Sequence, residues 1–404
     1  MTLTLLLDLD DTLLETNMGA FVPAYFQALS QHLAEQVPPE RMLPALMKGT
    51  ELMLASDDPA HTLQQVFEAY FYPSLGIPKE QLAGRIEQFY DDIFPSIGAV
   101  TKKRPGAVEL VNWALAKGHR LVVATDPLFP RKAIDHRIRW AGLDPGRFEL
   151  ISSFEAFHFT KPRPVYFAEV LGRLGWPSGP VLMAGNDVER DLEPAQALGL
   201  LTYQVSSDSA PRAGAFQTAP GASSARPGGT LPDLRSWLES AEPGPLGPAV
   251  QTPAAILAVM LSTPAVLQGL TASVSASGWP HQPDPDQWAL VEIICHLRDT
   301  EREIHHMQLS TLLEQREPFI PRPDRSVWAK ERNYLGEDGL AALQDFTSAR
   351  LQTLGRLAGL SEAVWKQEAR HAIFGPTHFQ EVIGFMADHD RLHIQQAWNL
   401  LRAL

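Results

Sequence analysis

Two carboxylates that lie two residues apart after an apolar run are the first sign of chemistry in this sequence. Asp8, Asp10 and Thr12 form a D-x-D-x-T motif directly after the run 3–7, which reads as a buried strand. Carboxylates this close repel one another unless a cation or an electrophilic phosphoryl group lies between them. The motif therefore indicates a site for Mg²⁺ and a phosphate group.

Three further segments carry polar residues that would meet this motif. Thr125 ends the apolar run RLVVAT, Lys161 opens KPRPVYF, and the acidic run GNDVERD occupies 185–191. Ligands of open α/β sheets bind just outside the carboxyl ends of the strands, where Asp8, Thr125 and Asp187 would all emerge. We therefore expect the four segments to share one site.

Taken in order, the four motifs resemble those of the haloacid dehalogenase superfamily over residues 1–240. The resemblance implies that Asp8 is a nucleophile that forms an aspartyl-phosphate, and that Asp10 protonates the leaving alcohol and later activates water. It implies that Thr125 and Lys161 hold and neutralise the phosphoryl oxygens. Phosphatases and phosphomutases of this superfamily keep the second Asp, whereas its dehalogenases lack it. We therefore expect Mg²⁺-dependent hydrolysis of a small phosphate monoester.

The resemblance also implies the Mg²⁺ ligands, with one ambiguity. The Asp8 carboxylate and the Asp10 backbone carbonyl would bind the ion, together with the acidic run. Asn186 has the usual four-residue gap to Asp191, but Asp187 satisfies an equally familiar three-residue gap. A charged oxygen is the better ligand for Mg²⁺. We therefore favour Asp187 with Asp191 and keep Asn186 as the alternative.

A second group of candidate ligands lies in the C-terminal part of the chain. His389 and His393 share the apolar stripe of a predicted helix, and His296 lies on a similar inward stripe. Three neutral imidazoles suit Zn²⁺, Ni²⁺ or Fe²⁺ and leave positions open for water or substrate. The pattern resembles the DinB-like four-helix bundle family over 252–404, in which such histidines bind a divalent metal. Cys295 lies about 100° around the helix from His296, so we expect a buried thiol rather than a ligand.

Alternating strands and helices must position the first group of residues. Apolar runs at 3–7, 120–125 and 181–185 predict buried parallel strands, and helical patterns lie between them. This alternation indicates a Rossmann-like, doubly wound α/β sheet. Residues from about 16 to 100 show helical periodicity only, which predicts a helical insertion. The resemblance makes this insertion a mobile cap over the site.

The C-terminal part follows a different pattern. Apolar spacing predicts an antiparallel all-α bundle of four helices, near 253–271, 286–313, 338–358 and 377–403. In the segment 206–230, 18 of 25 residues are Ser, Ala, Gly or Pro, which predicts a flexible loop. Prolines and glycines predict a linker at 241–251, so that the domains are 1–240 and 252–404.

Composition narrows the classes of partner. The 404 residues include 34 Lys+Arg and 47 Asp+Glu, a formal charge of −13, which argues against nucleic acid or an anionic membrane as partner. No run of about 20 apolar residues is evident, and the single cysteine excludes an intrachain disulfide. We expect a cytoplasmic protein that acts on a small phosphorylated metabolite, and a homodimer is left open.

Two other functions remain open. The first domain could bind a phosphorylated ligand for regulation without turnover, although the intact Asp8 and Asp10 argue against this. Alternatively, the bundle could be the working enzyme, as a metal-dependent thiol transferase or hydrolase. A bundle fold alone does not name a reaction.

Overall fold

The computed structural model describes residues 2–403 except 208–225, 241–246, 285–286 and 326. The chain folds into two compact units. Unit 1 comprises Met1–Arg163 and Pro177–Ala249, and unit 2 comprises Pro164–Trp176 and Val250–Leu404. Much of the loop predicted at 206–230 and of the linker predicted at 241–251 lies outside the described residues. The predicted domain limits therefore stay predictions.

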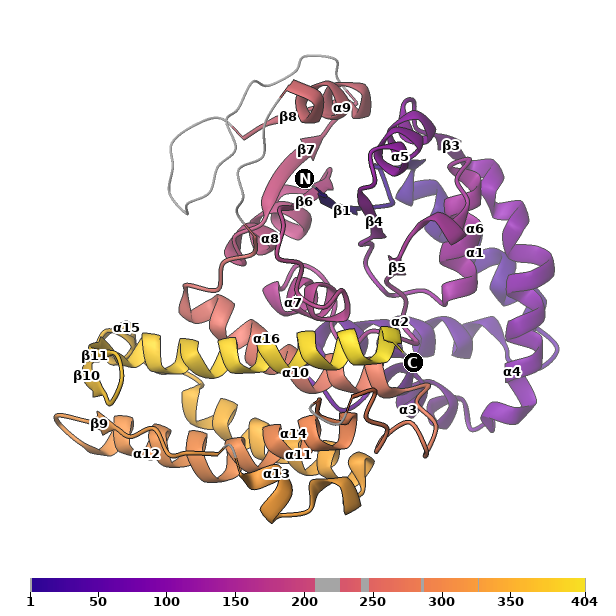
Figure 1. The fold of residues 1–404 in the computed structure, drawn as a ribbon. Coiled ribbons are helices and arrows are strands. Elements are labelled where there is room, and N and C mark those ends of the chain that lie inside the picture. Colours follow the sequence, from indigo (N-terminus) through magenta and orange to yellow (C-terminus); the bar gives the residue numbers. More distant parts are fainter. Residues whose placement is uncertain (1, 208–225, 241–246, 285–286, 326, 404) are drawn as a thin grey trace. The chain divides into compact units, whose positions relative to one another are not determined.

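A six-stranded sheet with the order β5-β4-β1-β6-β7-β8 forms the centre of unit 1 (Figure 1). All its neighbouring strands are parallel, which confirms the predicted α/β fold class. The strands are β1 (Thr4–Leu7), β4 (Arg120–Val123), β5 (Leu150–Ile151), β6 (Val181–Gly185), β7 (Leu201–Val205) and β8 (Gly228–Gly229). Every residue of β1 and β6 is buried, as apolar runs without alternation predict for central parallel strands.

The register of the sheet brings the strand ends together. Leu7 of β1 is level with Val123 of β4 and with Ala184 of β6. The residues that follow these strands therefore leave the sheet at one edge, where Asp8, Thr125 and Asn186 lie.

Helices complete the core of unit 1. They are α5 (Ala107–Ala116), α6 (Arg131–Trp140), α8 (Glu193–Ala197) and α9 (Leu231–Ser240), with the short turns η3 (Pro145–Arg147) and η4 (Val188–Leu192). Leu110 and Val111 of α5, Ile134 of α6 and Leu234 of α9 pack in one apolar cluster with the sheet.

A helical insertion separates β1 from β4, as predicted. Its elements are α1 (Met18–Leu33), α2 (Pro39–Ala55), α3 (Leu63–Leu75), α4 (Lys79–Gln88), η1 (Phe89–Ile93) and η2 (Phe94–Val100). An antiparallel ribbon of β2 (Leu14–Thr16) and β3 (Thr101–Lys103) joins its two ends. The cap therefore leaves and rejoins the core at one place, which the periodicity alone did not indicate.

Unit 2 contains the four predicted helices of the bundle. They are α10 (Pro253–Thr271), α11 with η5 and α12 (Leu290–Asp299, Thr300–His305, His306–Glu314), α14 (Gly339–Leu357) and α16 (Phe379–Ala403). Thr252 caps α10, because its side chain accepts a hydrogen bond from the Ala255 amide. Small elements that were not predicted connect these helices: α13 (Trp328–Glu331), η6 (Tyr334–Gly336), α15 (Glu362–Trp365) and a sheet of β9 (Phe319–Ile320), β10 (Glu368–His371) and β11 (Gly375–His378).

A fifth long element of unit 2 comes from the first half of the sequence. Helix α7 (Pro164–Arg173) belongs to this unit and packs along α10. A Cβ atom at Gly172 would lie 2.5 Å from the Val266 side chain, so the missing side chain lets the two helices approach closely. The sequence pattern gave no sign of this association.

Helix α10 corrects one expectation. An 18-residue stretch of this 19-residue helix has a mean hydropathy of 1.6, enough by length and composition to cross a membrane, although no such run was expected. In the structure, 67% of that stretch is buried. This burial is what a core helix of a bundle needs, because each of its faces meets apolar neighbours.

Candidate functional site

The first candidate site lies at the carboxyl edge of the sheet in unit 1, in a pocket of about 370 Å³. All the residues that the sequence assigned to this site line the pocket: Asp8, Asp10, Thr125, Lys161, Asn186, Asp187 and Asp191. The structure therefore brings the four motifs together.

Lys161 connects two of the carboxylates. Its Nζ donates to Asp8 Oδ1 at 2.8 Å and to Asp191 Oδ1 at 2.6 Å. All three side chains are buried. Burial raises the pKa of the Asp8 carboxyl above its usual value, Lys161 opposes this shift, and Asp191 and Asp10 add to it. Burial is thus the main reason that the charged form of Asp8 is disfavoured.

The turn after β1 presents Thr12 to the same carboxylate. Thr12 Oγ1 donates to Asp8 Oδ2 at 3.1 Å and also lies 3.3 Å from Asn186 Oδ1. Asp11 adopts a left-handed conformation with φ of 54°, and its side chain accepts a hydrogen bond from the Thr16 amide. The turn thus folds back so that Thr12 links the first and last motifs.

Asp187 and Asp191 of the acidic run make different hydrogen bonds. Asp187 Oδ1 accepts hydrogen bonds from the amides of Glu189 and Arg190, both at 3.0 Å, and so caps η4. Asp191 Oδ2 accepts from the Asp187 amide at 3.1 Å, while its other oxygen faces Lys161. A Cβ atom at Gly185 would lie 2.2 Å from Asp191 Oδ2, so only glycine admits this carboxylate.

Asp10 has a partner that the sequence reasoning missed. Arg137 of α6 forms an ion pair with Asp10, and the arginine is only 1% exposed. Its guanidinium carbon lies 5.2 Å from the ring centres of both Phe21 and Phe129. The one available signal was its place four residues after Ala133 on the apolar stripe of the helix.

The pocket has the donor set that Mg²⁺ requires. Asp8 and Asp191 offer carboxylate oxygens, Asp10 a backbone carbonyl and Asn186 an amide oxygen, all hard ligands. Burial, with a smaller contribution from Asp191 and Asp10, raises the pKa of Asp8, and a divalent cation would stabilise its charged form. The residues present therefore fit the ion.

The second candidate site lies in unit 2. His296 of α11 and His389 and His393 of α16 each offer a ligand atom, and these atoms lie within 4.8 Å of one another. His296 Nε2 is 3.1 Å from His389 Nε2. The predicted convergence of the three histidines on one point is therefore confirmed.

These imidazoles are held neutral. Burial lowers the pKa of His296 to about 3, with a smaller contribution from His393, and it lowers the pKa of His389 well below its ordinary value. A neutral imidazole is the form that binds a metal. His393 Nδ1 lies 3.0 Å from Gln396 Oε1, and Trp288 stacks on the His393 ring at 5.9 Å. Contacts of this kind orient a ligand before a metal binds.

A buried polar network lies beside the triad of His296, His389 and His393. Arg350 pairs with Glu301 and Asp390, and all three side chains have no exposed surface. Glu301 Oε2 in turn lies 2.8 Å from His305 Nδ1, and the His305 ring centre is 5.7 Å from that of His389. The network thus fixes a fourth histidine next to the three candidate ligands.

The position of His305 beside the triad does not follow from regular helical periodicity. Nine residues of regular α-helix make two and a half turns, which would place His305 opposite His296. The π-helix η5 (Thr300–His305) winds with more residues per turn and changes the face that His305 presents. Cys295 is fully buried as expected, and burial raises its pKa to about 12.

Two known protein families match separate parts of the chain. Residues 2–199 match the haloacid dehalogenase-like hydrolase family, and residues 261–397 match the DinB superfamily. The chain therefore joins a haloacid dehalogenase-like hydrolase domain to a DinB superfamily domain. No curated protein sequence matches it significantly.

Solved structures of both kinds are similar to parts of the chain. A HAD phosphatase from Thermococcus onnurineus has 18% identity and a TM-score of 0.37, covering 59% of this chain and 98% of that one. A 2-haloacid dehalogenase from Pseudomonas syringae pv. Tomato has 20% identity and a TM-score of 0.39, with the same coverage. YfiT from Bacillus subtilis, a protein of unusual four-helix bundle topology, has 17% identity and a TM-score of 0.34 over 37% of this chain and 85% of that one.

Proposed function

We propose that the haloacid dehalogenase-like domain hydrolyses small phosphate monoesters with Mg²⁺. The observation that carries this proposal is the second carboxylate, Asp10, in one pocket with Asp8, Thr125 and Lys161. A phosphatase needs an acid for the leaving alcohol, whereas displacement of a halide needs none. Asp10 therefore favours phosphate esters over haloacids.

The first step forms a covalent intermediate. An Asp8 carboxylate oxygen attacks phosphorus, the bond from phosphorus to the alcohol oxygen breaks, and the alcohol takes its proton from Asp10. Lys161 and Thr125 stabilise the charge on the phosphoryl oxygens. Asp8, Asp191 and the Asp10 carbonyl would hold Mg²⁺, with Asn186 or Asp187, and the ion would supply further charge neutralisation.

The second step restores the carboxylate. Asp10, now deprotonated, accepts a proton from water, whose oxygen attacks phosphorus while the bond to Asp8 breaks and phosphate leaves. The ion pair with Arg137 suits this step, because it holds the Asp10 carboxylate in one place. Of the two Mg²⁺ candidates in the acidic run, the contacts favour Asn186, since Asp187 already caps η4.

Phosphate release from a panel of phosphate monoesters tests this proposal. We expect turnover with Mg²⁺ and none after chelation by EDTA. Binding of phosphorylated ligands without any turnover would favour the regulatory alternative. Halide release from 2-haloacids, with no phosphate release, would favour a dehalogenase.

We further propose that the DinB domain binds one divalent transition metal through His296, His389 and His393. The convergence of their ring nitrogens within 4.8 Å supports this. The pocket beside His389 has a volume of about 360 Å³ and would leave room for a substrate at the metal. Elemental analysis of the full chain after loading with Zn²⁺, Ni²⁺ or Fe²⁺ tests it, and a thiol transferase or hydrolase activity stays an alternative function of the chain.

A further inference from the structure

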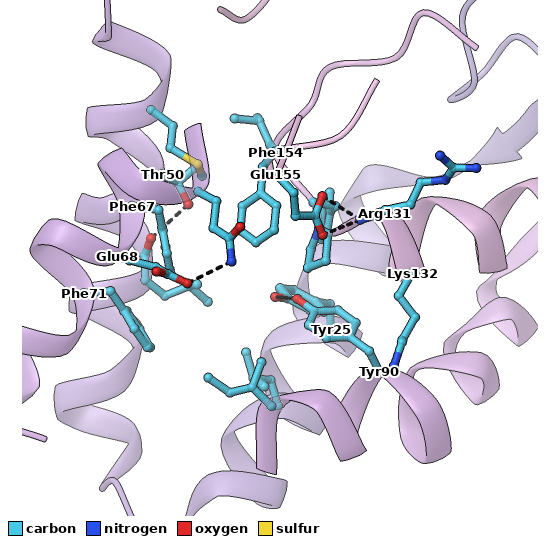
Figure 2. A pocket seen from close by; sticks show the side chains of 18 of the residues that line it. Tyr25, Thr50, Phe67, Glu68, Phe71, Tyr90, Arg131, Lys132, Phe154 and Glu155 are labelled. Atoms are coloured by element: carbon cyan, nitrogen blue, oxygen red, sulfur yellow. Dashed lines mark hydrogen bonds between the residues drawn. The ribbon is translucent and has the colours of Figure 1, made fainter. Parts of the chain in front are cut away.

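A second cavity, larger than the catalytic pocket, lies between the cap and core residues of unit 1. Its volume is about 830 Å³. Figure 2 shows Phe67 and Phe71 on one side of it and Tyr25 on the other. We call it the cap cavity.

The cap cavity adjoins the catalytic pocket. Met18, Leu128 and Phe129 line both spaces. Phe129 also lies against Arg137, the partner of Asp10. A molecule whose phosphate lies at Asp8 would therefore extend past these three apolar side chains into the cap cavity.

The polar groups of the cap cavity are largely engaged with one another. The hydroxyl oxygens of Tyr25 and Tyr90 are 3.0 Å apart, and the Thr50 hydroxyl donates to the Leu46 carbonyl. Glu68 accepts hydrogen bonds from Gln64 and Lys79 on its two oxygens. A sugar or polyol would have to break such contacts to gain its own hydrogen bonds.

The charges of the cap cavity also disfavour an anionic tail. Its lining holds three cationic side chains and four anionic ones: Lys79, Arg131, Lys132, and Glu68, Glu87, Asp135, Glu155. Each cation has a carboxylate partner: Lys79 pairs with Glu68, Lys132 with Glu87 and Arg131 with Asp135. A second phosphate or a carboxylate on the substrate would therefore find a net negative wall.

We propose that the cap cavity holds the apolar leaving group of the substrate, so that the substrates are phosphate monoesters of aromatic or medium-chain alkyl alcohols. This inference rests on the proposed function for the reaction. The cavity's preference for apolar groups is a property of binding, which can be measured without turnover. Rings and methylenes would replace water along the walls formed by Phe26, Phe67 and Ile86. The alcohol oxygen would remain near Asp10, which protonates it as described above.

Calorimetry with alkylphosphonates, which cannot be hydrolysed at the ester position, tests the cavity without turnover. With Mg²⁺ and the full chain, we expect the affinity to rise about fourfold for each added methylene from methyl- to hexylphosphonate. Hydrolysis of the matching alkyl phosphates is measured in parallel. Equal affinity for methyl- and hexylphosphonate would overturn the inference, as would a preference for glycerol phosphate or glucose 6-phosphate over hexyl phosphate.

Variants separate the cavity from the rest of the cap. Ala83→Phe should fill part of the cap cavity and lower the ratio of hexyl- to methylphosphonate affinity at least tenfold, whereas Ala20→Phe on exposed α1 surface should not. Phe67→Ala, which removes part of the wall, should also lower the ratio, and thermal melting checks that each variant folds. An unchanged ratio in both cavity variants would contradict the proposal. Length-dependent binding without any ester hydrolysis would refute the phosphatase and leave the cavity assignment standing.

Discussion

Arg137 forms a buried ion pair with Asp10, the carboxylate assigned as general acid and base. The guanidinium is enclosed by the rings of Phe21 and Phe129, so it has little freedom to move. Cap residue Phe21 and core residue Asp10 are thus joined through one side chain. Arg137 is in this view a positioning residue that acts through Asp10.

The first prediction concerns this pair. Arg137→Gln should lower kcat by roughly 10- to 100-fold, because the Asp10 carboxylate loses the group that orients it. The pH profile of kcat should change shape, since Asp10 carries the proton in both steps, and Arg137→Lys should recover part of the rate. Arg139→Gln on the exposed face of the same helix is the control. A uniform loss of activity with an unchanged pH profile would mean that Arg137 is merely structural.

The second prediction separates the two candidate Mg²⁺ ligands. Asn186→Ala should raise the Mg²⁺ concentration for half-maximal activity by about tenfold or more, because its Oδ1 lies at the Asp8 side of the pocket. Asp187→Ala should act mainly on stability, with a cost of about 1 kcal/mol for the lost cap of η4. Mg²⁺ titrations and thermal melts of both variants decide between them. A larger Mg²⁺ effect for Asp187→Ala would restore the assignment that the sequence favoured.

Much of the first site could be predicted because it depends on local rules. Asp8 and Thr125 follow apolar runs that can only be buried strands, and parallel strands end at one edge. The sequence could not show that Arg137 is buried, because Arg131 and Arg139 on the same helix are exposed. Its burial depends on the cap residue Phe21, more than a hundred positions away.

In unit 2, local patterns could likewise be predicted, whereas features that depend on an irregular helix or on tertiary packing could not. The triad could be predicted because His389 and His393 are one helical turn apart on an apolar stripe. The position of His305 beside the triad could not be predicted, since a π-helix changes the face that each later residue presents. The place of α7 in unit 2 depends on tertiary packing of Gly172 against Val266, which no periodicity reveals.

The third prediction concerns the metal of the DinB domain. In the full chain, His296→Ala, His389→Ala and His393→Ala should each deplete the bound metal, because two imidazoles remain. Helicity should persist, since the apolar stripes carry most of the packing. Elemental analysis and circular dichroism measure the two effects, with His378→Ala on the exposed surface as control. A folded parent chain that takes up no Zn²⁺, Ni²⁺ or Fe²⁺ would contradict the assignment.

The full chain is the right material for that experiment. A fragment of residues 250–404 would lack α7, which belongs to the same unit and packs against α10. A fragment that starts at residue 250 would expose this apolar surface to water. We therefore expect it to be less stable than a chain that includes α7.

The fourth prediction concerns the buried network of unit 2. Arg350→Met should lower the free energy of unfolding by about 3–5 kcal/mol, because Glu301 and Asp390 would be left buried without their cation. Arg356→Met, at a partly exposed position of the same helix, should cost much less. Urea unfolding followed by circular dichroism measures both. Equal stabilities of the two variants would show that the network is not required for the fold.

The central claim is that Asp8 is the nucleophile of a phosphatase. The most direct measurement is the rate of phosphate release, with Mg²⁺ and a phosphate monoester that the parent hydrolyses, by the Asp8→Asn variant. We predict a loss on the order of 10³-fold or more in a chain of unchanged melting temperature, because an amide cannot form the acyl-phosphate. Asp11→Asn, which alters the neighbouring turn residue, should stay within a few-fold of the parent. Hydrolysis by Asp8→Asn at the parental rate would contradict the account.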